Sequence, residues 1–433
     1  MKMIKEIKIR NIEIKNAIMM FSFCVFLFPS FFSSFSTYIY KNNVNVYIVQ
    51  VVSLIIGIVT SSSNYKITIS RGILNFQIIC IIIFVIQLLN NGDLAHGLTN
   101  YVILTAIELI FVNFLIAQNE NATINSCKTV YIFSLVHLFS GFYFYFNPDR
   151  YVEVAYRYFN LTKRTEELMK SGLAAGWLFT LTDQLSLSGI YMSVAVLIFF
   201  CTLQNARIRS SRITIHNVIF SVLAFAGLAL TGKRGPFVFT ILSVIIVYLI
   251  SYVGDNRKLV TFKIMAALFA FMIGYLVFIR IPAFQNMIFR LENAGGIGDT
   301  SANIRHEYAK TAISLFKQNP IFGIGWRQFR YVASNVNGND VHNTYLQLLA
   351  ETGMFGFIVF IYFFAMNYVR AIKLINNKLR TMNIQTYSPI YFSLGYQTFF
   401  ILYCFTGNPL YDIQLRTLYF VCCGITQYYE LQY

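Results

Sequence analysis

The sequence predicts an all-α protein that crosses a membrane about twelve times. Of its 433 residues, 57% are hydrophobic and only 12% are charged, whereas about a quarter of the residues in a typical soluble domain are charged. The apolar residues fall in repeated runs of roughly 17 to 20, the length that crosses the core of a bilayer as a helix. No separate soluble domain stands out, so we treat 1–433 as a single transmembrane domain.

The apolar runs give the spans in chain order. The first run follows a basic segment and is not followed by a small-residue cleavage site, so we interpret it as a retained first helix rather than a signal peptide. The spans are expected at 17–35, 44–60, 73–89, 101–117, 129–146, 187–203, 214–231, 236–253, 262–280, 345–367, 389–406 and 414–430.

Lys and Arg concentrate in every second short loop, as they do on the cytoplasmic side of membrane proteins. The intervening short loop 90–100 has neither residue type. This alternation predicts a cytoplasmic N-terminus. It also accounts for much of the net charge of +16, and no aromatic-interleaved basic motif favours nucleic-acid binding. The cytoplasmic basic residues are Lys66, Arg71, Arg207, Arg209, Arg212, Arg257, Lys258, Lys263, Arg370, Lys373, Lys378 and Arg380.

Two long connections are expected outside the membrane, at 147–186 and 281–344. The first contains NPDRYVEVAYRYFNLTKRTEELMK, which is typical of an amphipathic helix with interfacial aromatic residues. The second contains RHEYAKTAISLFKQNP, which is typical of a helix that ends near Pro320. Both loops are basic although they lie outside. The excess charge favours an anionic partner, either lipid headgroups or an anionic substrate.

Two basic residues occupy the very short outside turn LTGKRGPF, between the spans 214–231 and 236–253. Arg234 can donate two parallel hydrogen bonds to phosphate oxygens, and Lys233 adds a point charge. The flanking glycines would let the backbone approach a ligand closely. The alternative is that both side chains simply extend to the membrane interface.

Two more arginines border the large outside loop. Arg280 ends the span 262–280, and Arg305 begins the main helix of the loop. A diphosphate at the outer leaflet would need several such cations. Alternatively, Arg305 pairs with Glu307 on the same helix.

A histidine stands where the loop 281–344 enters the next span. His342 has an ordinary pKa of about 6.5, which makes it a candidate for proton transfer at neutral pH. Glu351 follows nine residues later, nearly on the opposite face of a continuous helix, so we expect it to brace a neighbouring segment rather than pair with His342. Tyr345 shares the face of the histidine and is expected to line the same site.

One acid, Glu108, lies near the middle of an apolar run, ILTAIELIFVNF. An ionisable residue there is a functional hypothesis by default, and it keeps a transporter under consideration. No buried Lys, Arg or His in the neighbouring predicted spans matches it. The seven cysteines lie mostly inside apolar runs and show no metal or disulfide spacing. No nucleotide-binding or metal motif is present in the sequence.

Two motifs stand close together in the chain: NPIFGIGWRQF (319–329) and HNTYLQLLAETGMFG (342–356). Their pattern of NP, then GxG with an aromatic, then HNxYLxxLxExGxxG resembles that of the O-antigen ligase/polymerase superfamily, and the resemblance covers about 215–365. The segment TGKRGP (231–236) is similar to a short family turn that bears an arginine, although Lys233 stands where the family often has serine.

The resemblance implies a metal-independent glycosyltransferase with a GT-C-like helical fold and no cofactor. It implies that Arg234 and Arg305 neutralise the diphosphate of a polyprenyl-diphosphate-linked sugar, and that His342 activates the acceptor hydroxyl. Lys233, Arg280, Asn343 and Tyr345 are expected to contact substrate. The site would face outward from the bacterial cytoplasmic membrane. Membrane lipids, a flippase and a chain-length regulator would be its partners.

Two activities fit the family. A polymerase transfers a lipid-linked chain onto a lipid-linked repeat unit of O-antigen or capsule, and a ligase transfers a finished chain to a lipid-A core or a protein. Two substantial outside loops favour the polymerase. A transporter or flippase is the alternative from another class, and it would be expected to carry charged residues inside several spans. The polar residues here collect outside and at helix ends instead.

Overall fold

The computed structural model describes residues 2–40, 43–61, 71–91, 108–109, 112, 116, 120–208, 215–251, 285, 300–332, 339–378 and 388–432. Within these ranges the regular structure is helical, with no strand. Helices are what a chain in lipid requires, because each one satisfies its backbone hydrogen bonds internally. The first helices are α1 (Lys2–Phe31), α2 (Ser33–Tyr40), α3 (Asn43–Ser61), α4 (Arg71–Asn91), α6 (Glu120–Phe146), α7 (Pro148–Tyr158), α8 (Lys163–Ala174) and α9 (Leu185–Ile208).

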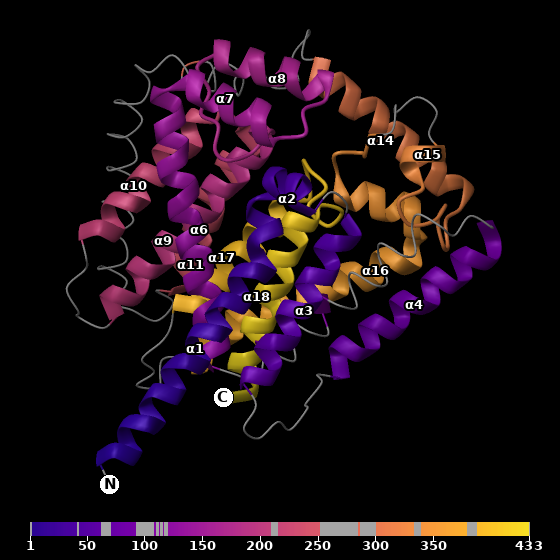
Figure 1. Ribbon diagram of the computed structural model, residues 1–433. Coiled ribbons are helices and arrows are strands. Elements are labelled where there is room, and N and C mark those ends of the chain that lie inside the picture. Colours follow the sequence, from indigo (N-terminus) through magenta and orange to yellow (C-terminus); the bar gives the residue numbers. More distant parts are fainter. Residues whose placement is uncertain are drawn as a thin grey trace.

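The remaining helices carry most of the family resemblance. They are α10 (Ile215–Leu230), α11 (Arg234–Ser251), α14 (Thr300–Gln318), α15 (Phe329–Val332), α16 (Thr344–Lys373) with the π-helical turn η2 (Leu374–Lys378), α17 (Ser388–Tyr403) and α18 (Ile413–Gln432). In Figure 1 both described ends of the chain lie at one end of the helix bundle, while α7, α8, α14 and α15 lie at the other.

Helices long and apolar enough to cross a membrane make this a multi-pass membrane protein. Among the described residues five qualify: Ile14–Phe31, Glu120–Phe146, Leu185–Leu203, Arg234–Ser251 and Thr344–Asn376. Shorter apolar helices cover Ile48–Thr60, Leu74–Ile86 and Ile215–Leu230. The predicted spans 389–406 and 414–430 coincide with α17 and α18. The predicted span 262–280 lies outside the described residues, as does most of 101–117, so the count of twelve stays a prediction.

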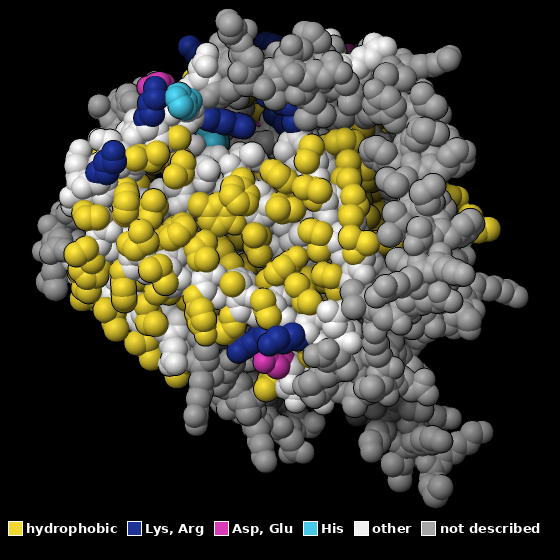
Figure 2. All heavy atoms as spheres, turned by 180° about the vertical axis from the view of Figure 1, so that it is seen from behind, with side chains coloured by type: hydrophobic (Ala, Val, Ile, Leu, Met, Phe, Trp, Pro, Cys, Tyr) yellow, Lys and Arg dark blue, Asp and Glu magenta, His cyan; other side chains and the backbone are white. Residues whose placement is uncertain are grey.

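The exposed surface of the bundle is apolar, as lipid contact requires. Large hydrophobic side chains are exposed on several helices, among them Val59, Ile81, Val222, Ile358 and Tyr362. Figure 2 shows a broad band of hydrophobic side chains across one face, with basic and histidine side chains gathered above it. A bilayer-facing belt with polar groups at its edge fits this distribution.

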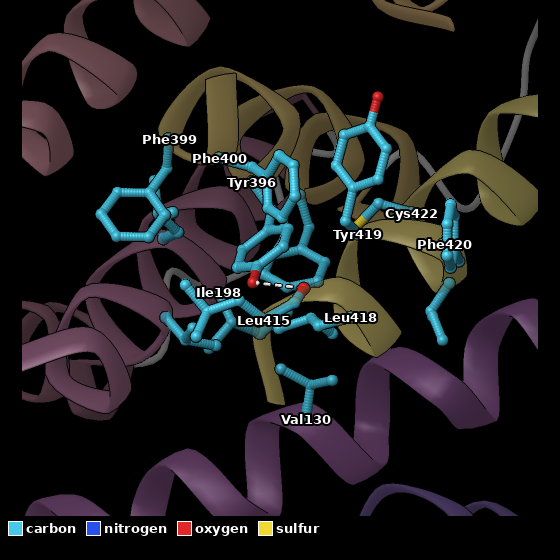
Figure 3. Packing of buried hydrophobic residues seen from close by; sticks show 14 of the residues in the cluster. Val130, Ile198, Tyr396, Phe399, Phe400, Leu415, Leu418, Tyr419, Phe420 and Cys422 are labelled. Atoms are coloured by element: carbon cyan, nitrogen blue, oxygen red, sulfur yellow. Dashed lines mark hydrogen bonds between the residues drawn. The ribbon is translucent and has the colours of Figure 1, made fainter. Parts of the chain in front are cut away.

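The core forms where α9, α17 and α18 meet. Within Leu185–Leu203, 83% of the residues are buried, which makes α9 the central helix of the described bundle. The rings of Phe400 and Tyr419 stack with centroids 4.2 Å apart. The Tyr396 hydroxyl donates to the Leu415 carbonyl at 3.0 Å, joining α17 to the start of α18 (Figure 3). In lipid, such close packing and internal hydrogen bonds supply the association energy that water supplies elsewhere.

The structure corrects the prediction that Glu108 lacks a basic partner. Arg416, in α18, donates from Nε to the Glu108 carboxylate at 3.1 Å, and the Thr417 hydroxyl donates to it at 2.6 Å. Both members of the ion pair are almost fully buried, with side-chain exposures of 3% and 2%. A second Arg416 nitrogen donates to the Leu410 carbonyl at 3.3 Å. Glu108 therefore belongs to a packed ion pair that joins distant parts of the chain.

Candidate active site

The site is built on α14, which packs against the first turns of α16. The helix α14 ends at Gln318, two residues before Pro320, as the sequence predicts. A small apolar cluster separate from the main core holds this layer together: Tyr308, Ala312, Leu315, Ile324, Phe329, Val341 and Ala350. The segment 319–325 then runs back along α16 and brings the loop against the helix.

Two motif glycines, Gly323 in the loop and Gly353 in α16, let the loop and the helix meet backbone to backbone. Ile324 N donates to the Ala350 carbonyl at 3.0 Å, Gly325 N to the Glu351 carbonyl at 2.9 Å, and Met354 N to the Pro320 carbonyl at 2.8 Å. Gly353 has φ 64° and ψ −170°, so α16 is broken there. The sequence pattern predicts a continuous helix over 345–367, and this prediction is wrong at Gly353. A glycine adopts the left-handed conformation without the steric cost of a Cβ.

Alanine at this break is expected to destabilise the protein. A Cβ at Gly353 would lie 2.3 Å from the Ile321 carbonyl oxygen, in a backbone conformation that side chains resist. Gly353→Ala should cost at least about 2 kcal/mol, seen as a lower midpoint of thermal unfolding in detergent. Gly176→Ala is the matched control, because Gly176 also has positive φ, at 69°, but has nothing within 4 Å of its Cβ position. Equal shifts for the two variants would contradict the close approach.

Glu351 ties the loop to the helix. Its carboxylate accepts hydrogen bonds from Arg327 N at 2.8 Å, Phe329 N at 3.2 Å and Gln347 Nε2 at 3.1 Å. Gln347 Nε2 also donates to Asp340 at 3.0 Å. These bonds join both ends of the described loop to one face of α16.

Asp340, two residues before His342, is a carboxylate that accepts hydrogen bonds from the side chains of Arg330 and Gln347. The Arg330 guanidinium donates to both of its carboxylate oxygens, once from Nε at 2.7 Å. Burial by itself would raise the pKa of Asp340, but hydrogen bonds and charge from Arg330 overcome it and hold the pKa below its ordinary value. Asp340 is therefore ionised at neutral pH and its partner Arg330 is engaged.

His342 stands on a strained backbone at the entrance to α16. Its φ is 58°, one of two positive values among the described non-glycine residues. Such conformations cost about 1–3 kcal/mol and cluster at functional sites. The next residue, Asn343, is the N-cap of α16: its side chain accepts from Leu346 N at 3.1 Å. The imidazole lies nearly parallel to the Tyr308 ring, with centroids 6.5 Å apart, and it remains accessible to solvent.

The surroundings of His342 favour its neutral form. Partial desolvation lowers its pKa from the ordinary value, and the positive charge of Arg305 lowers it further. The Asp340 carboxylate acts in the opposite direction, while Arg164 and Arg330 add to the lowering. A neutral imidazole at pH 7 can accept a proton, which is what a general base needs.

Arg305 is exposed beside the histidine. Arg305 does not pair with Glu307, because Glu307 forms an ion pair with Lys310 at 3.0 Å. Within the described part of the chain, Arg305 forms no hydrogen bond or ion pair of its own. Its charge acts on His342 and also on Tyr403, at the end of α17. The guanidinium is thus available to an anion close to His342.

The turn before α11 lies against the same part of α17. Arg234 is the first residue of α11, after Gly232 with φ 65°. A Cβ at Gly235 would lie 3.1 Å from the Thr406 hydroxyl and 3.7 Å from the Tyr403 ring. Both basic residues of this turn, Lys233 and Arg234, are half-buried.

The turn 403–407 is the junction at which these segments meet. Thr344 N donates to the carbonyls of Cys404 and Gly407 at 2.8 and 3.1 Å, fixing the start of α16 on it. Tyr345 donates from its hydroxyl to the Ile401 carbonyl at 2.8 Å, so it points toward α17. The start of α16, the start of α11 and the charge of Arg305 therefore converge there. Arg280, the remaining predicted contact, lies outside the described residues.

Several charged residues at the site carry little or no signal in the sequence. Asp412, in the turn before α18, is close enough to Asp340 for their charges to interact; burial, then repulsion from Asp340, raises its pKa to about 6. Arg327, the other non-glycine residue with positive φ, donates to the Tyr411 carbonyl at 2.5 Å. The only signal for Asp340 in the sequence is its place two residues before His342. Nothing local marks Asp412.

Comparison with known proteins identifies part of the chain. Residues 219–361 match the family model described as O-Antigen ligase. No curated protein matches the chain. The matched range contains Arg234, Arg305, His342 and Glu351, so it includes the three segments that meet at the turn 403–407. Members of this family are membrane enzymes of the glycosyltransferase type that act on lipid-linked polysaccharides. Over residues 219–361 the chain is thus similar to the O-antigen ligase/polymerase superfamily.

Proposed function

We propose that the protein is a polysaccharide polymerase, which transfers a glycan chain from polyprenyl diphosphate onto a lipid-linked repeat unit at the outer face of the bacterial cytoplasmic membrane. One observation carries the proposal: His342, at the entrance to α16, lies close to the exposed guanidinium of Arg305, whose positive charge helps to lower the pKa of the histidine. A neutral base beside an uncommitted guanidinium is the pair that transfer from a diphosphate requires.

The reaction follows from these groups. His342 accepts the proton of the acceptor hydroxyl as its oxygen bonds to the anomeric carbon of the donor. The bond between that carbon and the diphosphate oxygen breaks, and the electron pair leaves with the diphosphate. Arg305 and Arg234 stabilise the charge that develops there, an effect that fixed cations exert most strongly in a poorly hydrated site. The sugar is already activated by its diphosphate, so the reaction needs no nucleotide or metal.

Other predicted contacts have supporting roles in this scheme. Lys233 adds a charge beside Arg234, and Arg280 is proposed to face the same anion. Asn343 and Tyr345 hold the start of α16 through their bonds to Leu346 N and the Ile401 carbonyl, so their contribution is to position His342. Glu351 supports the loop that carries Arg327.

A ligase is the second candidate, and the description of the matching family favours it. The two activities share the donor and differ in the acceptor. The polymerase reading is supported by the size of both long loops, because two lipid-linked glycans must be held at once.

Reconstitution separates the two candidates. Purified protein in proteoliposomes is given a polyprenyl-diphosphate repeat unit alone, and the products are resolved on a gel. We expect a ladder of longer lipid-linked glycans. If no ladder forms and transfer begins only when a lipid-A core is added, the protein is a ligase. Absence of transfer under both conditions contradicts both candidates.

A further inference from the structure

We propose that Arg164, on α8 in the first long loop, is a further substrate-binding residue of the site, and that it contacts the diphosphate of a lipid-linked substrate together with Arg305. The proposal rests on the proposed function, because the ligand is the diphosphate of the proposed substrate. Arg164 lies outside the matched range 219–361.

The first observation is a direct contact between the two long loops. Arg164 Nη1 donates to the Asn339 side-chain oxygen at 3.4 Å. Asn339 Nδ2 in turn donates to the Tyr308 hydroxyl at 3.2 Å, and the Tyr308 ring faces His342. A chain of three side chains therefore leads from α8 to the imidazole.

The second observation is the position of α8. Its N-terminus is fixed by a capping box between Thr162 and Thr165, which holds Arg164 in the first turn. Trp177, which follows α8 in the chain, lies against the turn that bears Arg234. A Cβ at Gly232 in that turn would be 2.8 Å from the indole nitrogen of Trp177. Leu178 N also donates to the Leu230 carbonyl at 2.9 Å. The first loop therefore reaches both basic elements of the site, and Figure 1 shows α8 and α14 at the same end of the bundle.

The third observation is electrostatic. The Arg164 charge is close enough to His342 to act on it, alongside that of Arg305. Arg164 is exposed, and a 3.4 Å bond to a neutral amide leaves most of its five donors unused. Two exposed guanidiniums beside one neutral histidine repel each other, and an anion with several oxygens between them removes the repulsion. A diphosphate has the charge and the oxygens to engage both arginines in bidentate fashion.

The test compares charge-removing variants on one helix. Arg164→Ala should weaken binding of sugar-free polyprenyl diphosphate to the protein in nanodiscs by about tenfold, with Arg164→Lys in between. Lys170→Ala is the matched control, because Lys170 is an exposed cation on α8 that pairs with Glu166 at 2.7 Å. It should leave the affinity unchanged. Equal affinity of Arg164→Ala and wild type would overturn the proposal.

The kinetic constants and their pH dependence separate a role in substrate binding from a purely structural role of Arg164. Arg164→Ala should raise KM for the lipid-linked substrate more than it lowers kcat. Loss of its charge should also raise the pKa of His342, against the constant influence of Arg305, Asp340 and Arg330, and so move the acid limb of kcat/KM to higher pH. If Arg164→Ala has the same KM and the same acid limb of kcat/KM as wild type, the proposal is contradicted. Absence of wild-type turnover would instead contradict the proposed function.

Discussion

Replacing His342 with asparagine is expected to abolish glycosyl transfer and leave the protein folded. Loss of a positioned general base costs about 10²- to 10⁴-fold in rate. Asparagine is the informative substitution because His342 has φ 58°, and asparagine tolerates this left-handed conformation better than alanine does. The unfolding midpoint of His342→Asn should therefore stay close to that of wild type, while His342→Ala should also lose stability. The measurement is the initial rate of glycan elongation in proteoliposomes.

The neighbouring His306 provides the control. It is exposed on α14, one residue after Arg305, so His306→Ala should retain elongation. The pH profile gives an independent check. Because the pKa of His342 lies below its ordinary value, the neutral base is present at pH 7 and is lost only as pH falls through that lowered pKa. The acid limb of kcat/KM should therefore lie below pH 6.5. Elongation by His342→Asn at the wild-type rate would remove His342 from the mechanism.

Replacing Arg416 with alanine is expected to have the largest effect on stability. The substitution leaves Glu108 buried, with the Thr417 hydroxyl still bonded to it but no counter-charge among its described contacts. Breaking a buried pair from one side typically costs about 3–5 kcal/mol, because an uncompensated charge remains. We expect a large fall in the unfolding midpoint and in the amount of protein recovered from membranes.

Two further variants separate the charge from the packing. Changing both residues, in Glu108→Gln with Arg416→Gln, should recover much of the lost stability, since no unpaired charge is left. Arg150→Ala should have little effect, because the Arg150–Glu153 pair is exposed and such pairs contribute little. A midpoint for Arg416→Ala as high as that of Arg150→Ala would show that the buried pair is not a structural support.

Local sequence patterns predicted the features of the fold that depend only on residues close together in the chain. Apolar runs of bilayer length gave α6, α9 and α11, and Pro320 gave the end of α14, because length and backbone chemistry act over a few residues. The break at Gly353 escaped prediction, since the surrounding pattern is helical. Its cause is the Ile321 backbone, which lies 32 positions away in the chain.

Contacts between distant segments account for what the sequence could not give. The spacing of His342 and Glu351 argues against a direct pair, and the structure places the Glu351 carboxylate among loop amides. The partner of Glu108 could not be found because Arg416 is 308 residues away. The first loop likewise carries no motif that connects it to His342. Only the fold brings Arg164 to Asn339.

The loop segment 320–325 bridges the break at Gly353, because it bonds to α16 on both sides. Gly325 N donates to the Glu351 carbonyl before the break, and Met354 N, after the break, donates to the Pro320 carbonyl. The part before the break follows His342 and is also held by the turn 403–407. A change in tilt of the apolar part after the break, in a thicker or thinner bilayer, would therefore be transmitted to the loop that supports the histidine, so the activity should depend on bilayer thickness.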